Sequence, residues 1–147
     1  MREFGSEHPI IVLPDGYFDS FGNFNREILY LRSGREALLA VALDCKKEEH
    51  PVLLMPAYCC WSMSAPFKKA GWEVVYYRLN PDLTADIPYI EMLLQEFHPS
   101  AVLTMNFFGI ASTSQVVSCV KGFNPNIVVI IQYQIFNSKL IPGNFTM

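Results

Sequence analysis

The sequence predicts an α/β protein whose parallel sheet carries helices on both faces. Short apolar runs alternate with segments of helical periodicity, and the predicted strands follow one another at intervals of roughly 20–29 residues. Such alternation favours right-handed crossovers between parallel strands. Hydrophobic residues make up 51% of the chain and charged residues only 17%, which suits a sheet that is buried on both faces.

The first regular element begins within SGREALLA (33–40), which has the pattern of a capping box. The Ser33 hydroxyl is expected to accept a hydrogen bond from a first-turn amide while the Glu36 side chain reaches back, opening a helix of about ten residues. The apolar run at 52–55 predicts a central strand. A helix is expected over 62–70, with Gly71 placed to end it.

The second half of the chain repeats this order of strand and helix. Residues 72–79 are rich in Val and Tyr and predict a strand. Asp86 is placed to cap a helix over 87–97, whose apolar residues fall along one side. The remaining predicted elements are a strand at 101–105, a helix at 112–121 opened by a second box of Ser112 and Gln115, and a strand at 127–132.

Three regions follow from these patterns. Residues 1–31 are punctuated by Pro and Gly with interleaved aromatics, and they predict an irregular N-terminal arm. Residues 32–133 form the predicted α/β region, and residues 134–147 are a tail without a clear pattern.

Charge and cysteine content argue against several classes of partner. The chain has 11 basic and 14 acidic residues, a net charge of −3, and no basic patch of the kind that binds nucleic acid. No apolar run approaches the roughly 20 residues of a membrane span, and no signal peptide is visible. The four cysteines lack the spacing of a zinc site, so no metal is expected. We therefore expect a cytoplasmic protein with free thiols.

Two segments at the expected ligand-binding edge carry the candidate chemistry. In open parallel sheets, ligands bind beyond the carboxyl ends of the strands. The helix start at 33–36 offers free amides and a positive dipole end for a phosphate, and Gly34 permits close approach, although an ordinary capped helix would look the same. Trp61 follows a strand end, where its ring either stacks on a heteroaromatic ligand or packs into the core.

The ordered series SGREALLAVAL, VLLMPAYCCW, APFKKAGWEVVYYRLNPDLTAD, AVLTMNFFG and IVVIIQ resembles the first part of a DegT/DnrJ-type sugar aminotransferase. These are fold-type I enzymes that depend on pyridoxal phosphate and transfer an amino group to a keto-sugar. The resemblance implies that the cofactor phosphate binds at Gly34, Arg35 and Glu36. It also implies that the pyridine ring stacks on Trp61, or on Cys60 if the spacing is one residue shorter, and that the protein forms a homo-oligomer.

The chain departs from the family where the cofactor is activated. Tyr133 stands where the resemblance places an Asp that pairs with the pyridine nitrogen, and Phe136 replaces a usual His or Gln. The Schiff-base lysine is expected further along than Met147, and Lys139 comes too early to match it. We therefore expect a truncated aminotransferase-like protein, either a gene fragment or a shortened pseudoenzyme, that is inactive on its own.

The same residues also agree with an alternative function. In that interpretation, the chain is a non-enzymatic α/β module that binds a small molecule or pairs with itself or with a full-length paralogue. The strand at 127–132 is uncharged and contains no Pro, so as an edge strand it would promote self-association.

Overall fold

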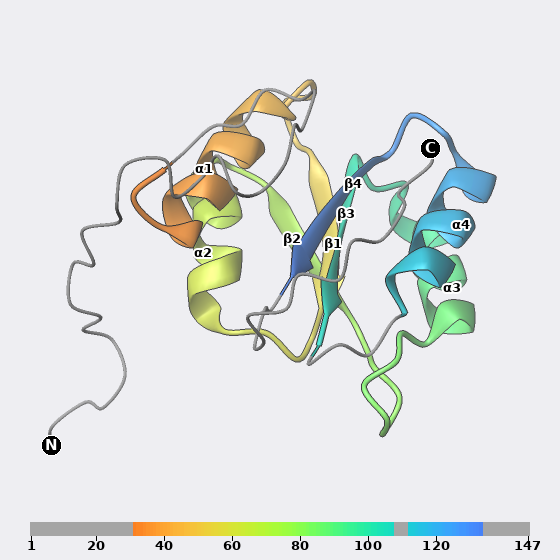
Figure 1. Ribbon diagram of the computed structural model, residues 1–147. Helices are drawn as coiled ribbons and strands as arrows, with labels where there is room; N and C mark the ends of the chain where they lie inside the picture. Colours follow the sequence, from red (N-terminus) through yellow and green to blue (C-terminus); the bar gives the residue numbers. More distant parts are fainter. Residues whose placement is uncertain (1–30, 108–111, 134–147) are drawn as a thin grey trace, which may run out of the picture. The chain divides into compact units, whose positions relative to one another are not determined.

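The computed structural model describes residues 31–107 and 112–133 of the chain (Figure 1). Helices and strands alternate throughout these residues, as the sequence predicts. In chain order they are α1 (Gly34–Asp44), β1 (Val52–Pro56), α2 (Trp61–Lys69), β2 (Glu73–Tyr77), α3 (Ile87–Phe97), β3 (Ala101–Asn106), α4 (Thr113–Phe123) and β4 (Val128–Tyr133). The predicted arm at 1–31 and tail at 134–147 lie almost entirely outside the described residues.

The four described strands form one sheet in which every neighbouring pair is parallel, in the order β2-β1-β3-β4. The chain passes from β1 outward to β2, crosses over to β3 on the other side of β1, and then continues outward to β4. This arrangement confirms the predicted α/β class with a parallel sheet.

Helices cover both faces of the sheet (Figure 1). The α1–α2 layer packs on one face, where alternate strand residues such as Leu53 and Leu103 point toward Phe67 of α2. The α3–α4 layer packs on the other face, where Leu54 and Val102 lie. Neighbouring strand residues thus contribute to opposite clusters, which is the pattern of a sheet buried on both faces.

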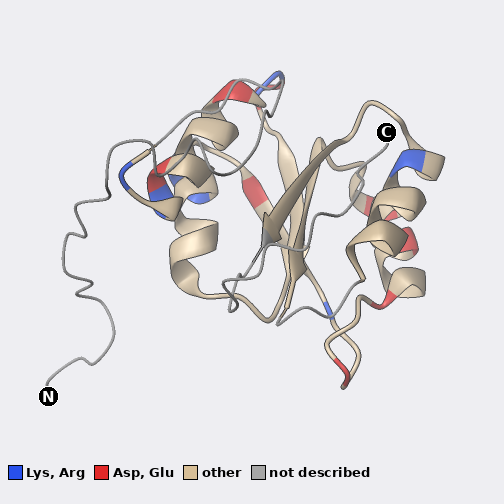
Figure 2. Cartoon of the chain, viewed as in Figure 1, with Lys and Arg blue, Asp and Glu red and all other residues tan. Residues whose placement is uncertain are grey.

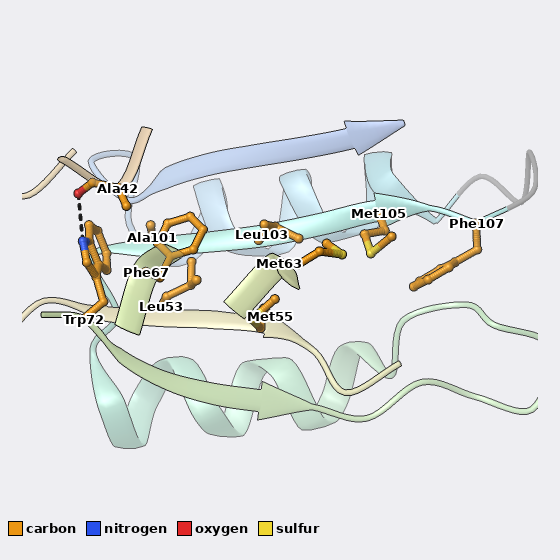
Figure 3. Packing of buried hydrophobic residues seen from close by; sticks show 10 residues of the cluster. All are labelled: Ala42, Leu53, Met55, Met63, Phe67, Trp72, Ala101, Leu103, Met105 and Phe107. Atoms are coloured by element: carbon orange, nitrogen blue, oxygen red, sulfur yellow. Dashed lines mark hydrogen bonds between the residues drawn. The ribbon is translucent and has the colours of Figure 1, made fainter. Parts of the chain in front are cut away.

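Two hydrogen bonds fix the direction of α1 relative to α2. The Trp72 indole N–H donates to the carbonyl of Ala42 at 2.8 Å (Figure 3), and the Lys46 ammonium donates to the carbonyl of Ala70 at 3.0 Å. These bonds join the C-terminal end of α1 to the chain just beyond the C-terminal end of α2. The two helices therefore run in the same direction, and both begin on the side where the strands end.

The predicted helix starts are confirmed at two places and wrong at a third. Ser33 caps α1, and Asp86 caps α3 by accepting a hydrogen bond from the Tyr89 amide at 3.1 Å. The predicted box of Ser112 and Gln115 does not form, because Ser112 makes no side-chain cap bond. Its backbone (φ −105°, ψ −5°) is helical, whereas a cap residue needs the extended backbone that Ser33 has (φ −155°, ψ 158°).

Candidate functional site

The carboxyl ends of β1 and β3 mark the place where this sheet is expected to hold a ligand. The helix after β1, α2, lies on one face of the sheet, and the helix after β3, α4, lies on the other. The two connecting segments therefore leave the neighbouring strand ends in opposite directions. Tyr58 follows β1 and Phe107 follows β3, and their ring centroids lie 5.6 Å apart at an angle of 52°. Aromatic side chains therefore line this end of the sheet on its α1–α2 side.

The start of α1 is held by a reciprocal pair of hydrogen bonds. The Ser33 hydroxyl accepts from the Glu36 amide at 3.2 Å, and the Glu36 carboxylate accepts from the Arg32 amide at 3.2 Å. The carboxylate thus reaches one residue further back than in the usual capping box. The backbone amide and the carboxylate of Glu36 therefore both stabilise the helix start.

The first two residues of α1, Gly34 and Arg35, are exposed. Within the part of the chain that the structure describes, the amides of Gly34 and Arg35 donate to no acceptor. A Cβ built on Gly34 would meet no atom within 4 Å. Since α1 has 11 residues, its N-terminus carries a positive dipole end that suits an anion. Acidic and basic residues mix at this end of the layer rather than forming a cationic face (Figure 2).

Trp61 is the first residue of α2, and its side chain is 73% exposed. The ring is absent from the apolar core on that face, which Met63 and Phe67 of the same helix enter. The alternative that Trp61 packs into the core is therefore wrong. Its neighbour Cys60 is also exposed, with its sulfur 2.8 Å from the Ser62 hydroxyl. Of these two candidates for ring stacking, only Trp61 offers an aromatic face.

The structure places the start of α1 and Trp61 on the same face and toward the same end of the sheet. No hydrogen bond or ring contact joins Gly34, Arg35 or Glu36 to Trp61 among the described residues. A ligand that spans a helix start and an aromatic face would be needed to connect them. Burial raises the pKa of the neighbouring Cys59 thiol, and Cys60 raises it further, so Cys59 is a poor nucleophile.

Three polar residues near the strand ends were not predicted as site residues. Asn106, Thr113 and Gln132 each have a buried side-chain oxygen without a hydrogen-bond partner in the described part of the chain. Buried polar atoms are normally paired, so each of these requires an explanation. The sequence could have identified two of these residues, since Asn106 and Gln132 are polar residues near the ends of mostly apolar strands.

A separate groove of about 390 Å³ lies between α3 and α4. Its lining comes from the middle and C-terminal parts of these helices and includes Glu91, Leu94, Gln95 and Cys119. Crossover helices run antiparallel to the strands, so this groove lies away from the carboxyl ends. We place no site there.

Within residues 31–107 and 112–133, no helix is long and apolar enough to cross a membrane. In the same residues, no three His, Cys, Asp or Glu side chains lie closely enough together to hold a metal ion.

Comparisons with known proteins place this fold. No family model and no curated protein matches the chain. A carbon-sulfur lyase involved in aluminum resistance from Clostridium novyi NT matches with a TM-score of 0.57 and 19% identity, over 67% of this chain and 28% of its own. A GDP-4-keto-6-deoxymannose-3-dehydratase with a trapped PLP-glutamate geminal diamine matches with a TM-score of 0.53 and 21% identity, over 67% and 27%. A histidinol-phosphate aminotransferase from Sinorhizobium meliloti in complex with pyridoxal-5'-phosphate matches with a TM-score of 0.52 and 10% identity, over 65% and 26%.

The chain therefore spans about a quarter of the length of these structures, between 26% and 28%. At such identities the likeness shows the fold alone. The described residues have the α/β fold of a part of the fold-type I enzymes that depend on pyridoxal phosphate.

Proposed function

We propose that this chain forms the phosphate-binding and ring-stacking part of a pyridoxal-phosphate site, in a protein of the DegT/DnrJ sugar aminotransferase type. The observation that carries the proposal is the pairing of an open helix start at Gly34 with an exposed Trp61 on one face and toward one end of a parallel sheet. The similar structures support the cofactor, because two of them contain pyridoxal phosphate or its adduct with glutamate. One of those two acts on a keto-sugar, which supports a substrate of that class.

The residues present fit the cofactor in four respects. The amides of Gly34 and Arg35 suit its phosphate, and the open space before Gly34 permits the approach. The Arg35 side chain is exposed and adds a positive charge beside the same amides. Glu36 is a positioning residue in this proposal, since its carboxylate and amide hold the helix start. The exposed Trp61 ring suits the flat face of the pyridine.

Pyridoxal phosphate, when bound, supplies a ring that withdraws electrons from an attached amine. The resemblance places a carboxylate for the ring nitrogen at the end of β4, but residues 127–133 are Ile, Val, Val, Ile, Ile, Gln and Tyr and include none. Without such a group the ring nitrogen is not held protonated and withdraws electrons poorly. We therefore propose that this chain binds the cofactor weakly and does not catalyse transamination by itself.

The test is a titration of the purified chain with pyridoxal 5'-phosphate, followed by the fluorescence of Trp61 and by amide chemical shifts at residues 34 and 35. Gly34→Val adds a branched side chain at the residue that carries the first of the two amides, and we expect it to hinder the approach of the phosphate and weaken binding at least tenfold, about 1.4 kcal/mol. Arg35→Ala is expected to weaken binding less, since backbone amides provide the main contacts.

The matched control is Gly122→Val. Gly122 is also a helical glycine whose added Cβ would meet nothing within 4 Å, but it lies in α4 on the other face. Binding should be unchanged in this variant. Equal affinity in Gly34→Val and the wild type, or shifts that avoid residues 34 and 35, would contradict the proposal.

A second function is favoured by the two edges of the sheet. Both edge strands carry a side chain of similar exposure, Tyr76 in β2 (38%) and Ile131 in β4 (39%). In β2 the exposed Glu73 lies on the strand and the Lys68 ammonium lies 5.7 Å from the Tyr76 ring centroid, and such charges discourage strand pairing. The sequence of β4 has no charge, and its outer edge has no partner strand among the described residues. We propose that β4 pairs with β4 of a second copy.

Sedimentation of the purified chain tests this pairing. Ile131→Lys should shift a self-associated chain toward monomer, because an edge lysine opposes strand addition. The control Tyr76→Lys puts the same charge on the other edge and should leave the assembly unchanged. A wild-type chain that sediments as a monomer at high concentration would be evidence against pairing through β4.

A further inference from the structure

Cys59 and Cys60 are adjacent free thiols in the segment that joins β1 to α2. Cys60 is exposed, and Cys59 is partly buried against the core beneath the α1–α2 layer. The other two cysteines, Cys45 and Cys119, are also partly buried, and neither has a second cysteine next to it in the sequence. The sequence thus contains one pair of neighbouring thiols.

Hydrogen bonds hold the backbone on both sides of this pair. The Cys59 amide donates to the Ala57 carbonyl at 3.1 Å, and the Met63 amide donates to the Cys60 carbonyl at 3.0 Å. Cys60 is the N-cap residue of α2, yet its sulfur makes no bond to the helix amides and lies 2.8 Å from the Ser62 hydroxyl. The pair therefore stands on a short, hydrogen-bonded connection, and helix capping does not occupy the exposed sulfur.

The spacing of the two thiols decides which thiol chemistry suits them. The α-carbons of adjacent residues lie about 3.8 Å apart across a trans peptide, whereas the two α-carbons of a disulfide usually lie roughly 4.4–6.8 Å apart. A direct disulfide between Cys59 and Cys60 is therefore strained. A third atom that bonds to both sulfurs lengthens the bridge and removes this conflict, and thiolates are soft ligands that favour a thiophilic atom.

The number of donors limits the identity of that atom. The described part of the chain contains no group of three His, Cys, Asp or Glu side chains that could hold a metal ion, so the pair offers two donors. A structural zinc site needs four. An ion that takes two thiolates in a line does not fit either, because adjacent side chains approach it from one side. A trivalent arsenic atom that carries one organic group has two further valences, and both can be directed to the same side.

We infer that Cys59 and Cys60 together form a covalent binding site for trivalent arsenicals with one organic group, compounds of the type R–As(OH)2. Each thiol displaces one hydroxyl group from arsenic. Two arsenic–oxygen bonds break, two arsenic–sulfur bonds form, and the thiol protons leave with the hydroxyl groups as two water molecules. Arsenic stays trivalent, so the step needs no oxidant or reductant. This ligand class is different from pyridoxal phosphate, and its binding does not depend on the proposed function.

The two thiols bond to arsenic one after the other. Cys60 bonds first, because its side chain is exposed to solvent. Burial raises the pKa of the Cys59 thiol, which makes Cys59 slow to attack a free ligand. Once arsenic is attached to Cys60, the second bond forms within one molecule, where the effective concentration is far higher. The closed ring then holds the organic group beside Trp61, the next residue in the chain.

The experiment treats the purified, reduced chain with phenylarsine oxide and measures its intact mass and its free thiols. The wild type should gain one phenylarsenic group and lose two of its four free thiols. An excess of glutathione should leave this adduct intact, whereas 2,3-dimercaptopropanol should remove it, because a single thiol cannot replace two linked ones. A wild-type chain that takes up no phenylarsenic group, or that loses it to glutathione, would overturn the inference.

Variants test whether both thiols of the pair are required. Cys60→Ser and Cys59→Ala each leave one thiol, and we expect the concentration of glutathione that removes the group to fall about a hundredfold. The matched control replaces both other cysteines, Cys45→Ala with Cys119→Ala, and should behave as the wild type does. An adduct that resists glutathione in Cys60→Ser, or that is lost in the control, would show that other thiols bind the arsenical.

Discussion

The α1–α2 layer and the α3–α4 layer cover the same sheet, yet their first helices, α1 and α3, are buried to different extents. In α3, Ile90, Leu93 and Leu94 are all buried, whereas in α1 only Ala42 is. The α1–α2 layer also exposes the large aromatic side chains of Tyr58 and Trp61 close to the strand ends. The helix α3 is therefore closely packed over its core, whereas α1 and the start of α2 leave apolar and polar groups accessible beside the carboxyl ends.

This difference shows that side chains that stabilise the fold and groups that are available to a ligand can lie on different helices of one fold. Burial of leucine and isoleucine under α3 contributes free energy of folding, at roughly 1.5–3 kcal/mol for each fully buried side chain. The exposed Trp61 side chain does not make such a contribution. The first amides of α1 are unpaired, so this helix start also lacks hydrogen bonds that would stabilise it. Groups that stay unsatisfied in a folded chain are the ones available to a ligand.

The largest expected effect contrasts one leucine from each layer. Leu94→Ala removes a fully buried side chain under α3 and should lower the free energy of unfolding by about 2–5 kcal/mol. Leu43→Ala in α1 alters a side chain that is 59% exposed and should cost less than about 0.5 kcal/mol. Urea denaturation at pH 7 measures both. Similar losses in the two variants would show that α1 is as tightly packed as α3.

The alternation of elements was predictable because local patterns determine it. The caps at Ser33 and Asp86 and the apolar strand runs were read from neighbouring residues, and the structure confirms them. The cap at Ser112 was not predictable, because the same residue types serve a cap only if the backbone before the helix is extended. That conformation depends on the tertiary path of the chain.

The candidate site was predictable only in part, for the same reason. The helix start and the Trp at a strand end are local features, and sequence identified them. Exposure of Trp61 and the face on which Gln132 lies depend on strand register and on packing between layers. A shift of one residue moves a side chain to the opposite face, so counting along the sequence places a residue near a strand end but does not determine the face on which it lies.

A smaller effect compares the starts of two helices. Ser33→Ala removes the hydroxyl that caps α1 and should cost about 1 kcal/mol of stability. Ser112→Ala at the start of α4 removes no cap bond, so its cost should stay below about half of that value. The free energy of unfolding in urea again gives both values, with Ser33→Asp as a variant that keeps a cap. Equal costs would mean that the Ser112 hydroxyl stabilises the α3–α4 layer in another way.

The smallest effect at neutral pH concerns the carboxylate that caps α3. The Arg78 side chain donates to Asp86 at 2.6 Å, and this bond, together with the Tyr89 amide, lowers the pKa of Asp86 below its ordinary value of 3.8. A lowered pKa stabilises the fold above that ordinary value, and the contribution is lost as the pH falls through the folded pKa. Both side chains reach solvent, so the effect should be modest and should weaken in salt.

Asp86→Asn isolates this charge, because asparagine caps a helix as well as aspartate does but does not titrate. We expect the wild type to be slightly more stable than the variant at pH 7, and the difference to be smaller at pH 2, since the contribution is lost as the pH falls through the lowered pKa of Asp86. Ser33 caps α1 with a hydroxyl that does not titrate, so Ser33→Ala should cost the same at both pH values. Urea midpoints at the two pH values decide the comparison. If the deficit of Asp86→Asn is as large at pH 2 as at pH 7, it arises from the geometry of the cap, and the two layers begin their helices in physically equivalent ways.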